Sequence, residues 1–312
     1  MLWACLFLLR LKKYPHMKIS AIINGSSKRA NRTKSELLNL GNIQVLLTKK
    51  AEDTNTFAIQ VLEEKVELVL VAGGDGTVNQ VINTWLRLKS KNLPMLAVIP
   101  IGSANDFVKT TGFKNIKTLL KNASENLVIP TDVLNLNANG TQRYCLNLTN
   151  IGIGANIAKT VAKRRMTWPS KLNYFSATVG WLTLYKAPKV ELMVDDYKLS
   201  LTTFLTAIGN AKFSGDGLCL CPQASINDGK MAVTIIGKVG LKDFIKYLPK
   251  LRLGQQIKDP RILYKKADSL RIKVVEGQLA LETDGEFVTT LTKNQVAQIS
   301  TLPACLRIVK PI

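Results

Sequence analysis

The chain has 312 residues, of which 43 are Lys or Arg and 22 are Asp or Glu, so its formal net charge is +21. This length suggests two domains or one large one, and a composition of 46% hydrophobic and 21% charged residues excludes a disordered chain. With His16 as its one histidine and five scattered cysteines without C-x-x-C pairs, the sequence disfavours Ser-His-Asp, Cys-His and His-ligated zinc chemistry and fits a reducing cytosol.

Residues 1–9 are apolar, but they are too few to span a membrane, and basic residues follow them rather than precede them. A secretory signal is therefore a poor fit. Two alternatives remain: a short extension that contacts a membrane, or a start placed too early, with Met17 as the true first residue. We favour the second, because residues 17–24 have the pattern of an ordinary opening strand.

From residue 19 to about residue 131, strands and helices alternate. Buried-type strands are predicted at 19–23, 43–47, 68–72 and 95–99, and helices at 34–39, 54–65 and 78–88. This alternation predicts a parallel sheet with helices on its faces, and such sheets bind ligands at the carboxyl ends of their strands.

After about residue 132 the pattern changes to short strands separated by turns. Strands are predicted at 133–136, 144–150, 190–194, 201–208, 231–236, 269–274 and 278–282, with helices near 171–185 and 241–253. The series predicts a mostly antiparallel β domain.

The glycine-rich segment Gly73-Gly74-Asp75-Gly76-Thr77 lies between a predicted strand and a predicted helix. Glycine permits close backbone approach to a ligand, and a helix N-terminus favours phosphate. Asp75 suits a hydrated Mg²⁺ ion, which is commonly held by few carboxylates. A tight turn capped by Thr77 is the alternative. The segment lacks the G-K-[S/T] ending of a Walker A loop.

Two further polar loops follow predicted strands. One is Gly102-Ser103-Ala104-Asn105-Asp106-Phe107, and the other is Asn24-Gly25-Ser26-Ser27-Lys28. Since the carboxyl ends of parallel strands meet at one edge of a sheet, we expect the three loops to converge.

The glycine-containing loops at residues 73–77 and 102–107, followed near the end of the chain by Asp284-Gly285-Glu286, resemble the diacylglycerol kinase catalytic family. More narrowly, they resemble its soluble bacterial lipid kinases. The resemblance covers nearly everything from Met17 onward. It implies an N-terminal α/β nucleotide-binding domain like that of NAD kinases and phosphofructokinases (residues 17–132), and a C-terminal β-sandwich domain for the lipid (133–301). Residues 302–312 would return to the first domain. The implied reaction is phosphorylation of a lipid hydroxyl by ATP, in a cleft between the domains.

The resemblance also assigns nucleotide contacts to the three loops and to the residue after the second strand. These residues are Asn24, Gly25, Ser26, Ser27, Lys28, Thr48, Gly74, Asp75, Gly76, Thr77, Val78, Asn79, Gln80, Ser103 and Asn105.

The motif Asp284-Gly285-Glu286 is the predicted source of the proton acceptor, because a carboxylate is the natural base in a chain without a histidine in its body. An extended backbone would point Asp284 and Glu286 to one face. We favour Glu286 as the base, with Asp284 as its partner, and count Asp75 as the third catalytic residue. The alternative is a hairpin turn with solvated acids.

Metal ligands follow from the resemblance as well. Asp106 and Asp132 match carboxylates that organise the catalytic Mg²⁺. A second, structural Mg²⁺ would be held by Asp228 and by main-chain oxygens of Ser225 and Lys230. An ordinary Asp-Gly turn at Asp228 is the alternative.

Positive charge favours anionic partners: nucleotide phosphates, nucleic acid or an anionic membrane surface. A row of lysines at i, i+4 spacing continues into the predicted helix near 241–253. It consists of Lys238, Lys242, Lys246 and Lys250, and it fits either an anionic lipid surface or solvent. A second basic and aromatic segment follows Lys163. Its members are Lys163, Arg164, Arg165, Trp168, Pro169, Ser170, Lys171, Leu172, Tyr174, Phe175, Trp181 and Tyr185.

The sequence therefore predicts a lipid kinase that uses ATP and Mg²⁺ to phosphorylate diacylglycerol or a related lipid such as phosphatidylglycerol. We expect a cytoplasmic enzyme that is peripheral to the inner face of a bacterial membrane. A homodimer is one expected arrangement of the protein, and nucleic acid is not expected as a partner. The alternatives are an NAD kinase-like enzyme and a catalytically silent lipid-binding module.

Overall fold

The computed structural model describes residues 17–90, 92–164 and 170–312, and divides into two compact units. The first contains the described residues up to Thr131 together with Leu306–Ile312, and the second contains Asp132–Cys305. The chain thus passes between the units twice, along β5 (Val128–Ala138) and β18 (Val296–Val309). The segment 1–16 and the positions Arg165, Trp168 and Pro169, discussed above, lie outside the described residues.

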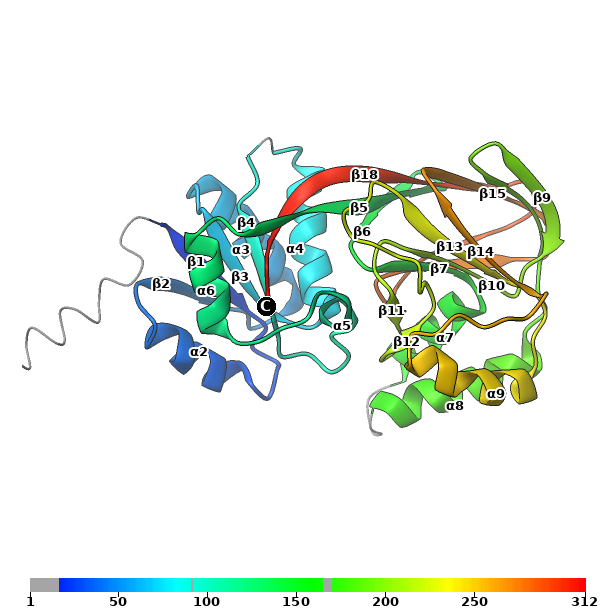
Figure 1. The fold of residues 1–312 in the computed structure, drawn as a ribbon, viewed down its shortest axis with the longest axis horizontal. Coiled ribbons are helices and arrows are strands. Elements are labelled where there is room, and N and C mark those ends of the chain that lie inside the picture. The colour runs from blue at the N-terminus through cyan, green and yellow to red at the C-terminus, as the bar shows by residue number, and fades with distance from the viewer. Residues whose placement is uncertain (1–16, 91, 165–169) are drawn as a thin grey trace, which may run out of the picture. The chain divides into compact units, whose positions relative to one another are not determined.

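The first unit is a parallel sheet covered by helices on both faces (Figure 1), which confirms the predicted α/β class. Strands β2, β1, β3 and β4 lie in that order and run parallel, and β18 joins them where Ile308 pairs with Leu96. Its elements are β1 (Ile19–Ile23), α2 (Ala30–Leu38), β2 (Ile43–Leu47), α3 (Ala51–Glu63), β3 (Leu68–Gly73), α4 (Asp75–Arg87), β4 (Met95–Pro100), α5 (Asp106–Thr111) and α6 (Ile116–Ser124).

The central strands are short apolar runs because the helices bury both of their faces. Every residue of β1 and β3 is buried. Helices α2 and α6 pack on one face of the sheet through Leu37 and Leu120, while Trp85 of α4 donates a hydrogen bond to the carbonyl oxygen of Ala58 in α3. These helices hold the carboxyl ends of β1, β3 and β4 in one fixed arrangement.

The second unit consists of two packed sheets in which neighbouring strands run antiparallel, as predicted for the C-terminal domain. One sheet has the order β14-β13-β10-β7-β16-β17, and the other contains β18, β15, β8 and β9, with β5 and β6. Its strands are β6 (Thr141–Cys145), β7 (Leu148–Gly152), β8 (Lys189–Val194), β9 (Tyr197–Thr202), β10 (Leu205–Gly209), β11 (Phe213–Ser214), β12 (Leu218–Cys219), β13 (Met231–Ile236), β14 (Ile262–Ala267), β15 (Ser269–Glu276), β16 (Leu279–Thr283) and β17 (Glu286–Leu291).

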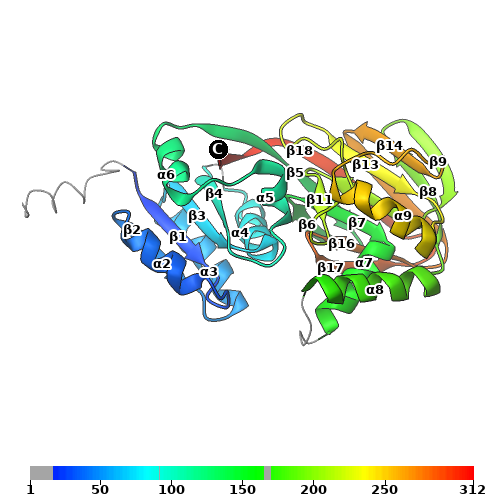
Figure 2. The ribbon, with the colours of Figure 1, turned by 60° about the horizontal axis from the view of Figure 1, so that its bottom comes forward.

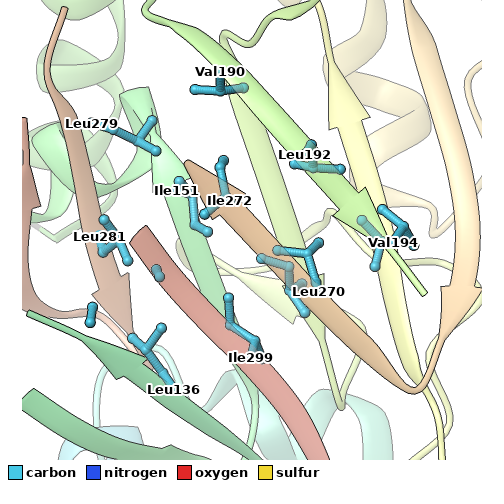
Figure 3. Packing of buried hydrophobic residues seen from close by; sticks show 14 of the residues in the cluster. Leu136, Ile151, Val190, Leu192, Val194, Leu270, Ile272, Leu279, Leu281 and Ile299 are labelled. Carbon is cyan, nitrogen blue, oxygen red and sulfur yellow. The ribbon is translucent and has the colours of Figure 1, made fainter. Parts of the chain in front are cut away.

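The core of this unit lies between the two sheets (Figure 3). Alternate residues of each strand enter it, as Val190, Leu192 and Val194 do from β8, because successive side chains of a strand point to opposite faces. Ile151 and Leu281 enter from the facing sheet. The β16–β17 hairpin lies at one edge of this sandwich.

Three helices accompany the sandwich: α7 (Ile153–Lys163), α8 (Ser170–Leu184) and α9 (Leu241–Arg252). Helix α7 packs on β16 and β17, and α8 contacts both α7 and α9 (Figure 2). Within the described part of the chain, no helix combines the length and the apolar character that a membrane crossing requires.

Two predicted strands are wrong in their extent, and α7 was not predicted. Residues 144–150 form the end of β6 and the start of β7, and residues 201–208 form the end of β9 and most of β10. At both places the chain leaves one sheet and enters the other. An apolar run shows where a strand is buried, but it does not show on which sheet it pairs.

Candidate functional site

One group of candidate residues lies in the first unit, where the loops after β3 and β4 are in direct backbone contact. A Cβ atom added to Gly102 would lie 2.3 Å from the Cα atom of Gly74, so no larger residue fits there. The amide of Gly102 donates to the carbonyl oxygen of Gly73 over 3.2 Å. The two glycine loops singled out in the sequence therefore form one continuous surface at the carboxyl ends of their strands.

Asp75 ties these loops together. Its two carboxylate oxygens accept hydrogen bonds of 3.0 Å from the amides of Asp106 and Phe107, the first two residues of α5. The side chain thus caps a helix that belongs to the other loop.

The loop after β1 joins the same surface. Asn24 donates to the hydroxyl of Thr77 over 3.3 Å, and Ser27 donates to the carbonyl oxygen of Ile101 over 2.7 Å. The Gly25 amide donates to the hydroxyl of Thr48 over 3.2 Å, and a Cβ atom at Gly25 would lie 2.0 Å from the Thr48 carbonyl oxygen. The three predicted loops are therefore brought together, along with Thr48 from the end of β2.

The predicted nucleotide contacts fall into two groups by exposure. Ser26, Lys28 and Ser103 have exposed side chains around the loops. Val78 and Asn79 are buried on the inner side of α4, where Asn79 accepts a hydrogen bond of 3.0 Å from Asn83. The structure gives these two side chains packing roles in the helix. Gly76 and Gln80 lie in the first two turns of α4, and Asn105 closes the second loop through two hydrogen bonds to Gly102.

Asp75 and Asp106 fit a hydrated Mg²⁺ ion. They are the first residues of α4 and α5, Asp75 half-buried and Asp106 buried, and Mg²⁺ keeps several waters and needs few carboxylates. Lys109 pairs with Asp106 at 2.7 Å, so a Mg²⁺ ion held by Asp106 would have to compete with the Lys109 ammonium group. No group of three or more acidic, histidine or cysteine residues that could hold a metal occurs in the described residues, so a protein-only cage is not the arrangement found there.

A separate group of candidate residues lies in the second unit, at the hairpin between β16 and β17. Thr283 pairs with Glu286 across a two-residue turn of Asp284 and Gly285, which have φ values of 49° and 85°. Positive φ at both positions is typical of the tight hairpin turns that Asp-Gly favours. The extended backbone predicted for this motif is therefore wrong. Asp284 is buried in the turn, and Glu286 is exposed at the start of β17.

Asp284 is the anchor of this hairpin. Its carboxylate accepts hydrogen bonds of 3.0, 2.9 and 2.9 Å from the amides of Leu146, Asn147 and Leu148, and one of 3.0 Å from the thiol of Cys145. Burial and the neighbouring Asp284 charge raise the pKa of the Cys145 thiol well above its ordinary value, so the thiol stays protonated as a donor. The alternative of solvated acids is therefore wrong for Asp284.

We expect Asp284→Asn to lower the free energy of unfolding by about 3 kcal/mol, because an amide group would leave buried N–H donors without an acceptor. Chemical denaturation monitored by circular dichroism measures the change. Asp196→Asn is the matched control, since Asp196 lies exposed in the turn between β8 and β9. Equal stability of the two variants would contradict the anchoring role.

Glu282 and Arg143 are two residues of this site that the sequence did not identify. Glu282 is buried, contacts Asn150 through a short hydrogen bond, and accepts one of 2.7 Å from the Gly285 amide. Arg143, on β6, lies near enough to influence Glu286 electrostatically. The sequence offered no signal for either residue. Glu282 contacts Asn150 and Arg143 lies near Glu286, and the members of each pair are more than 130 residues apart along the chain.

The environment of Glu286 suits a proton acceptor. Desolvation by the surrounding protein is the main cause that raises the pKa of its carboxyl group, the Asp284 charge raises the pKa further, and Arg143 opposes both. A raised pKa makes the ionised carboxylate a stronger base. Proton acceptance by Glu286 is thus chemically reasonable at this position.

The predicted metal ligand Asp228 is likewise paired with a lysine. Asp228 forms an ion pair with Lys266, and its carboxylate also accepts from the amide of Lys230 over 3.2 Å. Lys230 pairs in turn with Asp268 at 3.1 Å. A Mg²⁺ ion bound by Asp228 would have to compete with the Lys266 ammonium group. Ser225 donates its hydroxyl hydrogen bond to Asn227 in the same loop.

Asp132 contacts this same loop. Its carboxylate accepts hydrogen bonds of 2.7 Å from the Gly229 amide and 2.8 Å from the Ala304 amide, and it is buried. Asn210 adds a hydrogen bond of 2.8 Å to the main-chain oxygen of Asp132. These contacts give Asp132 a role in joining the loop to β5 and β18, and its predicted role in a Mg²⁺ network stays a prediction.

Comparison with protein families identifies both halves of the chain. Residues 18–136 match the diacylglycerol kinase catalytic domain, and residues 148–310 match the YegS C-terminal NAD kinase beta sandwich-like domain. The boundary of the two matches falls near the point where the parallel sheet gives way to the sandwich.

Relatives are similar over most of their length. The chain is 29% identical over 245 residues to a diacylglycerol kinase of Bacillus subtilis, covering 77% of this chain and 78% of that protein. It is 27% identical to a probable YegS-like lipid kinase of Serratia proteamaculans, covering 72% and 74%. A crystal structure of a putative diacylglycerol kinase from Bacillus anthracis superposes with a TM-score of 0.72 at 25% identity, covering 96% and 98%. Yeast NADH kinase shares the fold, with a TM-score of 0.51 at 11% identity, covering 95% and 83%.

Proposed function

Because the chain belongs to the family of bacterial diacylglycerol kinases and YegS-like lipid kinases, we propose that it phosphorylates a hydroxyl group of diacylglycerol or a related lipid, with ATP as donor and Mg²⁺ as cofactor. The observation that carries this proposal is the double hydrogen bond from the amides of Asp106 and Phe107 to Asp75. It joins the two glycine loops into one backbone surface that includes a carboxylate.

The first unit would bind the nucleotide. Helix α4 begins at Asp75, directly after Gly73 and Gly74, so its N-terminus offers amide donors and a favourable dipole to phosphate oxygens. Lys28 and Ser103 are exposed beside these loops and would add a positive charge and a hydroxyl donor. When bound, Mg²⁺ would neutralise charge on the phosphates, and Asp75 and Asp106 are the residues that would hold it.

The second unit would supply the base. The Glu286 carboxylate would accept the proton of the lipid hydroxyl as the hydroxyl oxygen forms its bond to the γ-phosphorus, and the bond from that phosphorus to the ADP oxygen breaks. Asp284 would hold the turn and raise the basicity of Glu286, while Glu282 would fix Gly285 between them. Both residues would act by positioning the base.

The proposal is tested by incubating the purified chain with ATP, Mg²⁺ and mixed micelles that contain a total bacterial lipid extract. Mass spectrometry should find one lipid class that gains a phosphate group, and only when ATP is present. NAD is included in a parallel reaction. Phosphorylation of NAD, with no lipid modified, would overturn the proposal in favour of a nucleotide kinase.

The pH dependence of the reaction gives a more specific prediction. We expect kcat/KM to fall as the pH drops through the pKa of Glu286, because protonation removes the base. Arg143→Gln should move this fall to higher pH, since Arg143 stabilises the carboxylate and lowers its pKa. A pH–rate profile measures the shift.

Arg271→Gln is the matched control for the Arg143 substitution, because Arg271 is exposed on β15 and contributes nothing to the Glu286 pKa. An unshifted profile in Arg143→Gln would show that Glu286 is not the titrating base.

A further inference from the structure

Helix α9 has one face fixed to the domain and one face open to solvent. Tyr247 and Leu251 are buried and pack with Ile257 and Ile262 in a small apolar cluster. The helix has no other large buried side chain among its twelve residues. Its orientation on the sandwich is therefore determined by this narrow stripe.

An ion-pair network at the start of the helix holds the same orientation. Asp243 accepts hydrogen bonds of 2.9 and 3.0 Å from the guanidinium of Arg261 and one of 3.0 Å from the Gly240 amide. Arg261 also contacts Asp259, which forms a short hydrogen bond with Tyr247. The one acidic residue of α9 is thus paired on the side that faces the domain.

The opposite face of α9 carries positive and apolar side chains and no acidic one. At 100° per residue, its exposed residues occupy a single arc. We call this arc the α9 outer face, and its members are Lys242, Ile245, Lys246, Pro249, Lys250, Arg252 and Leu253. Lys242, Lys246 and Lys250 form no ion pair with any other described residue. Ile245 is 56% exposed and Leu253 is 71% exposed.

The neighbouring helix α8 adds exposed apolar surface. It contacts α9, and among its fifteen residues only Lys171 is charged. Leu172, Phe175 and Leu184 are 54%, 47% and 77% exposed. Surface helices ordinarily place polar residues on the side facing water, so exposed leucine and phenylalanine side chains on a nearly uncharged helix indicate a partner surface.

We propose that the α9 outer face, with the exposed apolar side chains of α8 beside it, docks the protein on an anionic lipid bilayer. The lysines would contact negatively charged headgroups, and Ile245 and Leu253 would enter the boundary between headgroups and acyl chains. An uncompensated row of lysines interspersed with exposed aliphatic side chains matches this chemistry. If this face contacted only water, polar residues would be expected at the positions of Ile245 and Leu253. The inference rests on the proposed function in one respect, because a kinase acting on bilayer lipids must reach their surface.

The test is co-sedimentation of the full chain with sonicated vesicles of phosphatidylcholine, with and without phosphatidylglycerol. Wild-type protein should bind the vesicles that contain phosphatidylglycerol, and more weakly as salt is raised. Lys242→Gln/Lys246→Gln should bind ~30-fold more weakly, since each basic residue near an anionic surface contributes a factor of about five. Lys242→Arg/Lys246→Arg should bind as wild type.

The matched control is Lys198→Gln/Lys293→Gln, which removes the same charge from exposed positions on β9 and on the loop before β18. Ile245→Ser/Leu253→Ser should also weaken binding while leaving the charge unchanged. Equal binding by the α9 lysine variant and this control would overturn the proposal. So would binding of wild type to phosphatidylcholine alone with equal affinity, or binding to DNA instead of vesicles.

A second measurement separates this inference from the proposed function. Phosphorylation of a short-chain diacylglycerol dissolved as monomers needs no bilayer, so Lys242→Gln/Lys246→Gln should retain wild-type activity in that assay. If wild type binds vesicles as described but phosphorylates no lipid, the proposed function fails and the docking surface stands. If it phosphorylates the monomeric lipid but binds no vesicles, the docking surface fails and the function stands.

Discussion

Asp75→Asn is expected to lower kcat/KM for ATP-dependent lipid phosphorylation by about 10²–10³-fold, the scale on which loss of a group that stabilises developing charge acts. Asparagine keeps one oxygen that can accept from the Asp106 or the Phe107 amide, but it removes the negative charge that would hold Mg²⁺. The measurement is a steady-state assay with radiolabelled ATP and the lipid identified by the mass-spectrometric screen.

The stability of Asp75 variants separates a catalytic role from a structural one. Asp75→Ala loses both hydrogen bonds to α5 and should destabilise the first unit by about 2 kcal/mol, whereas Asp75→Asn should cost less. Glu36→Gln, on the exposed side of α2, is the matched control. If Asp75→Asn kept near-wild-type activity, the residue would be a helix cap alone and the proposed metal site would have no support.

Glu286→Gln is expected to lower kcat by ~10²–10⁴-fold, the range that a positioned general base contributes. Glutamine has the same shape and cannot accept the proton of the lipid hydroxyl. The binding of ATP should change little, because the nucleotide contacts are assigned to residues of the first unit. Single-turnover kinetics with saturating ATP separates the chemical step from binding.

Two features make the Glu286 experiment decisive. Glu276→Gln is the control, since Glu276 is an exposed glutamate at the end of β15. The variant should also lose the acidic fall of the pH–rate profile, because the group that titrates is gone. Full activity in Glu286→Gln would refute the assignment of the base.

Periodicity alone was sufficient for the strands of the first unit but not for its helices, because no residue range was predicted for α5 or α6 and α2 begins four residues before the predicted start at residue 34. The apolar runs at β1, β2, β3 and β4 are bounded by polar turns, and the structure places these strands within a residue of the predicted limits. Strands buried on both faces have continuous apolar sequences, so their limits are sharp. The convergence of the three loops was likewise foreseeable, since parallel strands align their carboxyl ends.

Periodicity was insufficient where the chain changes sheets. The junctions of β6 with β7 and of β9 with β10 lie inside single apolar runs, because both strands on either side face the same core. The prediction of an extended backbone at Asp284 was wrong for a related reason. The dipeptide Asp-Gly indicates a turn, but its partners at 145–148 come from a distant strand, and burial of the carboxylate depends on them.

The sequence by itself determined the fold class, the family and the loops that we propose to carry the chemistry, because these depend on local periodicity and on residue types at short spacing. Only the tertiary structure decided which carboxylates are anchors and which are exposed, and that Arg143 and Asp284 act oppositely on the pKa of Glu286. Those properties arise from charges and hydrogen-bond donors brought together across long stretches of chain, and electrostatic interactions depend on distance in space rather than along the sequence.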